Sequence, residues 1–174
     1  MGKDMAKKAA LGGVLTACAL IFSYVEYLVP INIGVPGIKL GLANIVIIVA
    51  LYGLGAKYAF AINITRILIA GMLFSGVFGM LFGLTGGILS LTVMALLVRT
   101  NVFGVAGISV AGGVAHNIGQ LVAAAFFIAN FAVVYYLPVL LLSGVLTGLL
   151  IGLLSDILMR RLNINRLPKR RKPV

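Results

Sequence analysis

Residues that bind metals or form disulfides are scarce in this chain of 174 residues. Cys18 is the only cysteine, so neither a disulfide nor a cysteine-based metal site forms within one chain. His116 is the only histidine, and it lacks the companions that a zinc site needs. The sequence therefore predicts no bound metal and no cofactor, and it does not reveal the redox compartment.

Acidic side chains are equally scarce. Asp4, Glu26 and Asp156 are the only carboxylates, and they lie far apart in the sequence. Enzymes that act on prenyl diphosphates normally hold Mg²⁺ with closely spaced aspartates, and no such pair exists here. The chain also lacks the G-x-x-x-x-G-K-[ST] loop that binds nucleotide phosphates. We therefore expect that the chain is not an enzyme and does not hydrolyse ATP itself.

Apolar residues dominate what is present. Hydrophobic residues make up 62% of the chain and charged residues only 10%, and the mean hydropathy is +1.20. A soluble domain of this length carries a much larger charged fraction. The composition is typical of a polytopic protein, so we expect a multi-pass protein of the cell (inner or cytoplasmic) membrane.

The length of the apolar runs, interrupted by glycine and by charge, predicts an all-α integral membrane protein with six transmembrane helices in one bundle. A single transmembrane domain is predicted over residues 1–158, followed by a basic cytoplasmic tail over 159–174. The predicted spans cover about residues 9–29, 39–55, 58–75, 77–98, 103–130 and 134–158.

The basic residues that give the chain its net charge of +11 are distributed as expected for a membrane protein. With six spans, the lysines and arginines of the two ends, Lys57 and Arg99 all fall on one side of the membrane, which leaves Lys39 on the other. Because basic residues concentrate on the cytoplasmic side, both termini are predicted to be cytoplasmic. This distribution argues against a nucleic-acid partner and favours contact of the basic tail with anionic lipid.

Arg66 is the exception, because it lies in the middle of the predicted span 58–75. Insertion scales assign roughly 2.5–3.5 kcal/mol to such a charge at the bilayer centre, so it needs a partner, water or a ligand. Two interpretations follow. Arg66 binds an anionic ligand, or it is a structural charge paired with Glu26 or with backbone carbonyls.

The segment 30–39 is unlike the other connections, since it contains two prolines and two glycines and is nevertheless apolar. We predict that it lies on the outer side and covers the bundle as a lid. The alternative is a tight structural turn at the interface. Glu26 and Lys39 flank the segment, and a pairing between them across it is predicted.

Further polar residues are predicted to face the same interior space as Arg66. Asn63 precedes Arg66 by three residues, and His116 precedes Gln120 by four, so the members of each pair share a helix face. The alternative role for these side chains is hydrogen bonding between helices. The predicted ligand-binding residues are Arg66, His116, Asn117, Gln120, Asn63, Asn44, Lys39 and Glu26.

Small residues recur at every fourth position on two spans, where they allow another helix to approach closely. Gly79, Gly83 and Gly87 form one such ridge, which suits packing within the chain. The other ridge lies on the first span, and we predict that it docks a partner subunit. Its residues are Ala9, Gly13 and Ala17.

Four segments, Val35–Asn44, Arg66–Ser75, Gly86–Ser90 and Ala115–Gln120, resemble the small bacterial membrane proteins called heptaprenyl diphosphate synthase component I, also known as Gx transporter proteins. The resemblance covers nearly the whole chain. In size, six-helix plan and lid-like first loop, the chain is also similar to the S components of energy-coupling factor (ECF) transporters.

These resemblances imply two different functions. S components capture a small ligand in the outer half of the membrane under the first loop, and their first helix docks a transmembrane coupling subunit that two ATPases drive. The component I family instead implies a non-catalytic accessory or scaffold subunit, associated with a polyprenyl diphosphate synthase or with isoprenoid-quinone metabolism. A channel is disfavoured, because the chain has no ring of charge and no filter-like sequence.

Overall fold

The computed structural model describes residues 2–29, 40–129 and 131–164. These residues form no β-strand, so the described chain is all-α, as predicted. Each predicted span overlaps one α-helix. The elements are α1 (Gly2–Leu28), α2 (Leu42–Gly53), α3 (Ala56–Ala70), the π-helix η1 (Gly71–Ser75), α4 (Gly76–Thr100), α5 (Val105–Ile128), the 3₁₀-helix η2 (Phe131–Tyr136) and α6 (Leu137–Arg161).

Four helical stretches are long and apolar enough to cross a membrane, and they identify a membrane protein. They are Asp4–Leu28, Ala56–Thr100, Val105–Phe127 and Ala132–Arg161. Helix α2 is apolar but has only 12 residues. At 1.5 Å per residue it measures about 18 Å, against a hydrocarbon core of about 30 Å. The second predicted span, 39–55, therefore contains a helix shorter than the span itself.

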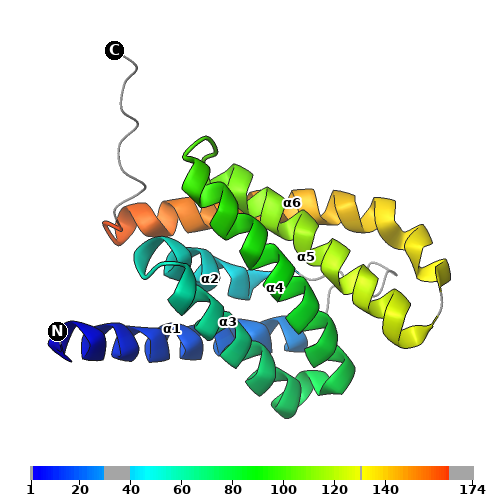
Figure 1. Cartoon of the computed structure of the whole chain (residues 1–174), viewed down its shortest axis with the longest axis horizontal. Helices are drawn as coiled ribbons and strands as arrows, with labels where there is room; N and C mark the ends of the chain where they lie inside the picture. Colours follow the sequence, from blue (N-terminus) through cyan, green and yellow to red (C-terminus); the bar gives the residue numbers. More distant parts are fainter. Residues whose placement is uncertain (1, 30–39, 130, 165–174) are drawn as a thin grey trace.

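The long stretch Ala56–Thr100 is a hairpin. Gly76 has a φ of +69° at the junction of η1 and α4, and Figure 1 shows α4 returning alongside α3. A Cβ at Gly83 would lie 3.1 Å from Cγ2 of Ile67, and one at Gly87 would lie 2.9 Å from Nδ2 of Asn63. From Gly83 to Gly87 the residue number on α4 rises, while that of the contact on α3 falls from 67 to 63. Helices α3 and α4 are therefore antiparallel. This ridge packs within the chain, in agreement with the sequence.

Helix α2 forms the centre of the apolar core. Residues 45–51 are buried on every face of the helix, which is the pattern of a helix enclosed by others. Ile47 and Ile48 belong to one cluster with Leu91 of α4, Ile108 of α5 and Met159 of α6. The surrounding helices thus fix the position of α2, including its first turn.

Helices α5 and α6 approach each other through a glycine ridge that the sequence analysis missed. A Cβ at Gly148 would lie 2.7 Å from Cα of Val110, and one at Gly152 would lie 2.7 Å from Cα of Ala106. Gly144 continues the same spacing toward the start of α6. Backbone-to-backbone packing of this kind requires glycine, and it holds α5 firmly beside α6.

The turns between helices are divided between the two ends of the bundle, and both described chain ends lie at the same one. Figure 1 shows the start of α1, the α2–α3 and α4–α5 turns and the end of α6 at one end. Every lysine and arginine in the described ranges, except Arg66, lies in or next to these segments. Arg66 is thus the one described basic side chain that lies away from the basic end.

Candidate functional site

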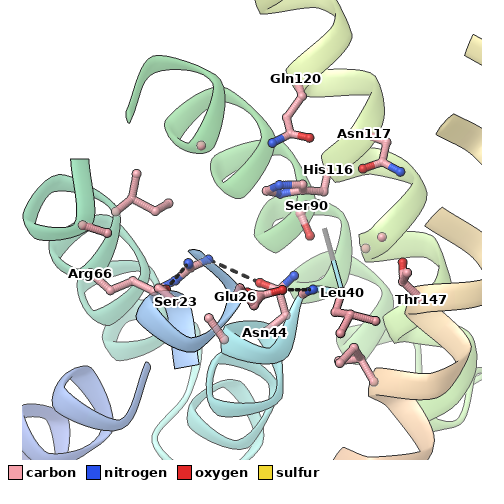
Figure 2. A pocket seen from close by; sticks show the side chains of 18 of the residues that line it. Ser23, Glu26, Leu40, Asn44, Arg66, Ser90, His116, Asn117, Gln120 and Thr147 are labelled. Carbon is pink, nitrogen blue, oxygen red and sulfur yellow. Dashed lines mark hydrogen bonds between the residues drawn. The ribbon is translucent and has the colours of Figure 1, made fainter. Parts of the chain in front are cut away.

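A cavity of about 630 Å³, here called the central cavity, lies between the six α-helices. Its volume falls within the range of roughly 300–1,000 Å³ typical of small-molecule sites. Figure 2 shows polar side chains from several helices around it. Its polar lining includes Ser23, Glu26, Asn44, Arg66, Ser90, Ser109, His116, Asn117, Gln120 and Thr147.

Arg66 reaches into the central cavity from α3 and donates hydrogen bonds to three neutral oxygens. Its Nε donates to Oδ1 of Asn63 at 3.1 Å. Its Nη1 donates to Oγ of Ser23 at 3.3 Å, and its Nη2 donates to Oδ1 of Asn44 at 3.4 Å. The last two bonds are drawn in Figure 2. Since a guanidinium carries five N–H donors, these bonds leave donors for a further partner.

Glu26 lines the same cavity but does not pair directly with Arg66. Within the described ranges, no carboxylate oxygen lies within 4.0 Å of the Arg66 guanidinium. Oε1 of Glu26 instead accepts a hydrogen bond from the backbone N–H of Gly41, just before α2. Gly41 has a φ of +78°, which favours glycine at this turn. Glu26 and Arg66 therefore form no direct ion pair within 4.0 Å.

Asn63 lies behind Arg66 rather than on the wall of the central cavity. It is only 2% exposed, and its Nδ2 donates to the carbonyl oxygen of Gly87 at 3.1 Å. Its Oδ1 accepts from Arg66, so the amide joins α4 to the guanidinium. Asn63 therefore contacts the Arg66 guanidinium and α4 and does not belong to the described lining of the cavity.

His116 and Gln120 both line the central cavity, and Figure 2 shows their side chains pointing into it from α5. Oε1 of Gln120 is buried and accepts no hydrogen bond from any described residue. Helix α4 lies close behind both residues. A Cβ at Gly86 would lie 2.8 Å from the carbonyl oxygen of His116 and 2.9 Å from Cγ of Gln120.

Asn117 points in a different direction from its two neighbours on α5. Its Nδ2 donates to the carbonyl oxygen of Leu140 at 2.7 Å and to Oγ of Ser143 at 3.2 Å, both on α6. It is buried and still contributes to the cavity lining. Its amide nitrogen nevertheless serves contact between helices, the alternative that the sequence left open.

An aromatic cluster lies beside the central cavity, between α1 and η1. Phe74 lies 5.6 Å from the Tyr24 ring and 5.2 Å from the Tyr27 ring, measured between centroids. Phe74 and Tyr27 both line the central cavity. Phe74 belongs to the π-helix η1, and π-helical turns often occur at functional sites.

The sequence analysis missed hydroxyl residues of the lining, among them Ser90, Ser109 and Thr147. Serine and threonine in apolar helices commonly bond the carbonyl four residues earlier, as Thr147 does at 2.8 Å, and therefore look structural. The available signal was their proximity to glycine, since Ser90 follows Gly87 by three residues and Thr147 precedes Gly148.

Two other predicted groups are the 30–39 segment with Lys39 and the small-residue ridge of the first span. Lys39 and the 30–39 segment fall outside the described residues, so the lid and the Glu26–Lys39 pairing stay predictions. The predicted docking ridge on α1 is exposed at Ala9, Gly13 and Ala17. No atom lies within 4 Å of a Cβ built at Gly13, so α1 has no intrachain neighbour at this point.

Comparison with known families supports the resemblance seen in the sequence. A family model described as heptaprenyl diphosphate synthase component I matches residues 15–158. The chain belongs to the heptaprenyl diphosphate synthase component I family. The matched range of component I extends from α1 into α6 and contains the whole described lining of the central cavity. No curated protein and no solved structure matches the chain.

The central cavity of this component I chain combines one guanidinium with amide, imidazole and hydroxyl groups. No group of three metal-binding side chains occurs among residues 2–29, 40–129 and 131–164. The free donors of Arg66 suit an anionic group, while Gln120 offers an acceptor. This arrangement can bind a small molecule, because it provides charge, hydrogen-bond partners and enclosing apolar walls together.

Proposed function

We propose that this protein is the substrate-binding membrane subunit (S component) of an ECF-type uptake transporter. In this proposal it captures a small vitamin- or precursor-like ligand from outside, and an anionic group of the ligand binds Arg66. The observation that carries the proposal is a guanidinium in the central cavity with donors to spare and no carboxylate within 4.0 Å. Charged side chains inside membrane helix bundles mark functional sites, and substrate pathways are one class of these.

The proposal includes six membrane crossings, with α2 as a short enclosed crossing and both termini in the cytoplasm. The gathering of lysine and arginine at one end of the bundle supports this orientation. Val29 and Leu40 flank the 30–39 segment and also line the central cavity. The cavity thus extends toward the end opposite the basic end, which is the outer side of the cell membrane in this topology.

The proposed partners are a transmembrane coupling subunit and the ATPases that drive it. The exposed ridge Ala9, Gly13 and Ala17 supports docking on α1, because small residues permit close approach of another helix. The chain itself is proposed to be non-catalytic and to depend on these subunits for energy.

A second candidate function rests on the family's description, which calls its members component I of a synthase. In that case the chain is a non-catalytic membrane scaffold that binds a polyprenyl diphosphate synthase. Affinity purification of the full chain from its native membrane separates the two proposals. Recovery of coupling and ATPase subunits supports the first, whereas recovery of a soluble synthase without ATPases supports the second.

Ligand capture is tested by native mass spectrometry of the full chain purified from membranes. We expect the wild-type protein to retain a small anionic molecule and Arg66→Ala to lose it while still folding and being extracted from the membrane. Arg99→Ala is the matched control, because it also removes an arginine, but an exposed one at the basic end. Retention of the same molecule by Arg66→Ala, or recovery of phospholipid alone, would contradict the proposal.

A further inference from the structure

We infer that the central cavity selects an anion that also carries a neutral N–H or O–H donor. The anionic group binds Arg66, and the donor binds Oε1 of Gln120. This inference rests on the proposed function, since it assumes that the cavity holds a captured small molecule. It narrows the substrate class to acids or phosphates that bear an amide, imide, ring N–H or hydroxyl group.

The two binding groups come from different sides of the central cavity. Arg66 of α3 lies with Ser23 and Asn44, on the side of the cavity that α1 and α2 form. His116 and Gln120 project from α5 on another side, as Figure 2 shows. A molecule that contacts both sides therefore needs two separate polar groups. The cavity, at about 630 Å³, has room for such a molecule with apolar atoms between them.

The chemistry at Gln120 decides what the second group must be. Oε1 of Gln120 is buried, and no described residue donates a hydrogen bond to it. A buried acceptor without a donor is unfavourable, whereas the same acceptor with a donor contributes to binding. The ligand group that satisfies Oε1 must carry a hydrogen on nitrogen or oxygen. A carboxylate, a methyl group or a hydrocarbon chain does not meet this need.

The backbone of α4 confines the stem of the Gln120 side chain. A Cβ at Gly86 would lie only 2.9 Å from Cγ of Gln120, so the side chain of Gln120 packs directly against the glycine. A Cβ at Gly119 would lie 2.9 Å from the carbonyl oxygen of Thr85, so α4 and α5 touch through their backbones at this level. The stem of Gln120 therefore has little freedom to turn away. A side chain whose stem is already confined loses less entropy when a ligand binds.

This geometry separates two ligand chemistries that Arg66 alone does not distinguish. An isoprenoid diphosphate supplies the anion, but its hydrocarbon tail leaves Gln120 without a donor. A polar acid with an N–H or O–H group satisfies both positions. Sites built around a buried hydrogen-bonding group reject analogues that lack the matching group by about tenfold at the least.

The experiment uses the full chain in lipid nanodiscs, washed free of small molecules and then equilibrated with the low-molecular-mass fraction of a bacterial extract. The retained compound is identified by mass spectrometry, and deuterium exchange counts its N–H and O–H groups. That compound and its N- or O-methyl derivative are then titrated against wild type and Gln120→Met. Val122→Met is the matched control, since Val122 is exposed on the same helix.

We expect the retained compound to carry an anionic group and an exchangeable donor, and methylation of the donor to weaken binding to wild type at least tenfold. In Gln120→Met the parent compound should bind at least tenfold more weakly, and the parent and its derivative should bind equally. Comparing the affinities of the two proteins for the two compounds isolates the contact between the donor and Gln120. Val122→Met should behave as wild type.

The outcomes distinguish this inference from the proposed function. A compound that depends on Arg66 but has no exchangeable donor, or that binds equally well after methylation, overturns the inference and leaves ligand capture intact. A compound retained by Arg66→Ala contradicts the proposed function. Wild-type protein that retains no compound contradicts both. If Gln120→Met fails to fold, the titrations of wild type with the parent and its derivative still decide the inference.

Discussion

Oδ1 of Asn63 accepts a hydrogen bond from Nε of Arg66 at 3.1 Å, while Nδ2 of the same amide donates to the carbonyl oxygen of Gly87 at 3.1 Å. One buried amide therefore connects the backbone of α4 to the cation of the central cavity. Because the amide is neutral, it orients Arg66 without cancelling its charge. The guanidinium keeps its attraction for an anionic ligand.

Asn63→Asp should convert this neutral support into an ion pair. The new carboxylate would accept from Nε of Arg66 and neutralise it, and charge-assisted bonds of this kind are about twice as strong as neutral ones. We expect affinity for the copurified anion to fall about tenfold or more, measured by titration in nanodiscs. Asn63→Ser, which stays neutral, is the control. Equal losses in both variants would show that the charge of residue 63 is irrelevant.

Glu26→Gln should raise the affinity for the anion, whereas Asn63→Asp should lower it. Glu26 contributes a negative charge to the lining of the central cavity, and its contact with the Gly41 N–H persists with a glutamine oxygen. Removing a like charge near a bound anion strengthens binding, by about 1 kcal/mol or less in a partly hydrated site. We expect a rise of about two- to fivefold in affinity for the anion. A clear loss of affinity would instead indicate that the carboxylate binds the ligand directly.

Gly86→Ala should destabilise the protein, because its Cβ would lie 2.8 Å from the carbonyl oxygen of His116. Overpacking at such a contact costs about 1–3 kcal/mol, and it also displaces Gln120. The measurement is thermal unfolding in a fixed detergent. Gly12→Ala is the matched control on α1, since no atom lies within 4 Å of its Cβ. We expect that variant to melt at or slightly above the wild-type temperature, because alanine favours helix by up to about 1 kcal/mol.

Asn117→Leu should separate a structural role from ligand contact. The substitution removes the bonds to Leu140 and Ser143 that join α5 to α6. Hydrogen bonds between membrane helices contribute about 0.6–2 kcal/mol, so we expect a lower melting temperature. Affinity for the copurified molecule should change less than threefold at temperatures where the variant is folded. A large loss of affinity without a change in melting would assign Asn117 to ligand binding.

The all-helical fold followed from the sequence because apolar length and charge position are local properties that a chain displays directly. Arg66 was identified for the same reason, as a charge within an apolar run. The family followed from the four segments that resemble it, and the family model confirms it. The orientation of neighbouring side chains was harder to predict. Spacing places His116 and Gln120 on one face and Asn117 about a quarter turn away, but it does not say which face meets the cavity.

The structural features that the sequence did not predict share one physical origin, which is contact between helices. The rotation of α5 depends on its backbone contacts with α4 at Gly86 and with α6 at Gly148, and these pair residues distant in the sequence. The π-helical turn of η1 likewise leaves no mark in the apolar pattern of 58–75. Such features depend on which helices become neighbours, so sequence spacing alone does not reveal them.

The enclosure of α2 has a consequence for how the protein responds to its membrane. Residues 45–51 have no face exposed to the surroundings, so this helix does not adjust by tilting against lipid as exposed helices do. Matching to bilayer thickness is left to the five helices around it. The turn that carries Asn44 is thereby insulated from lipid composition. We therefore expect the wall of the cavity that Asn44 provides to depend little on bilayer thickness.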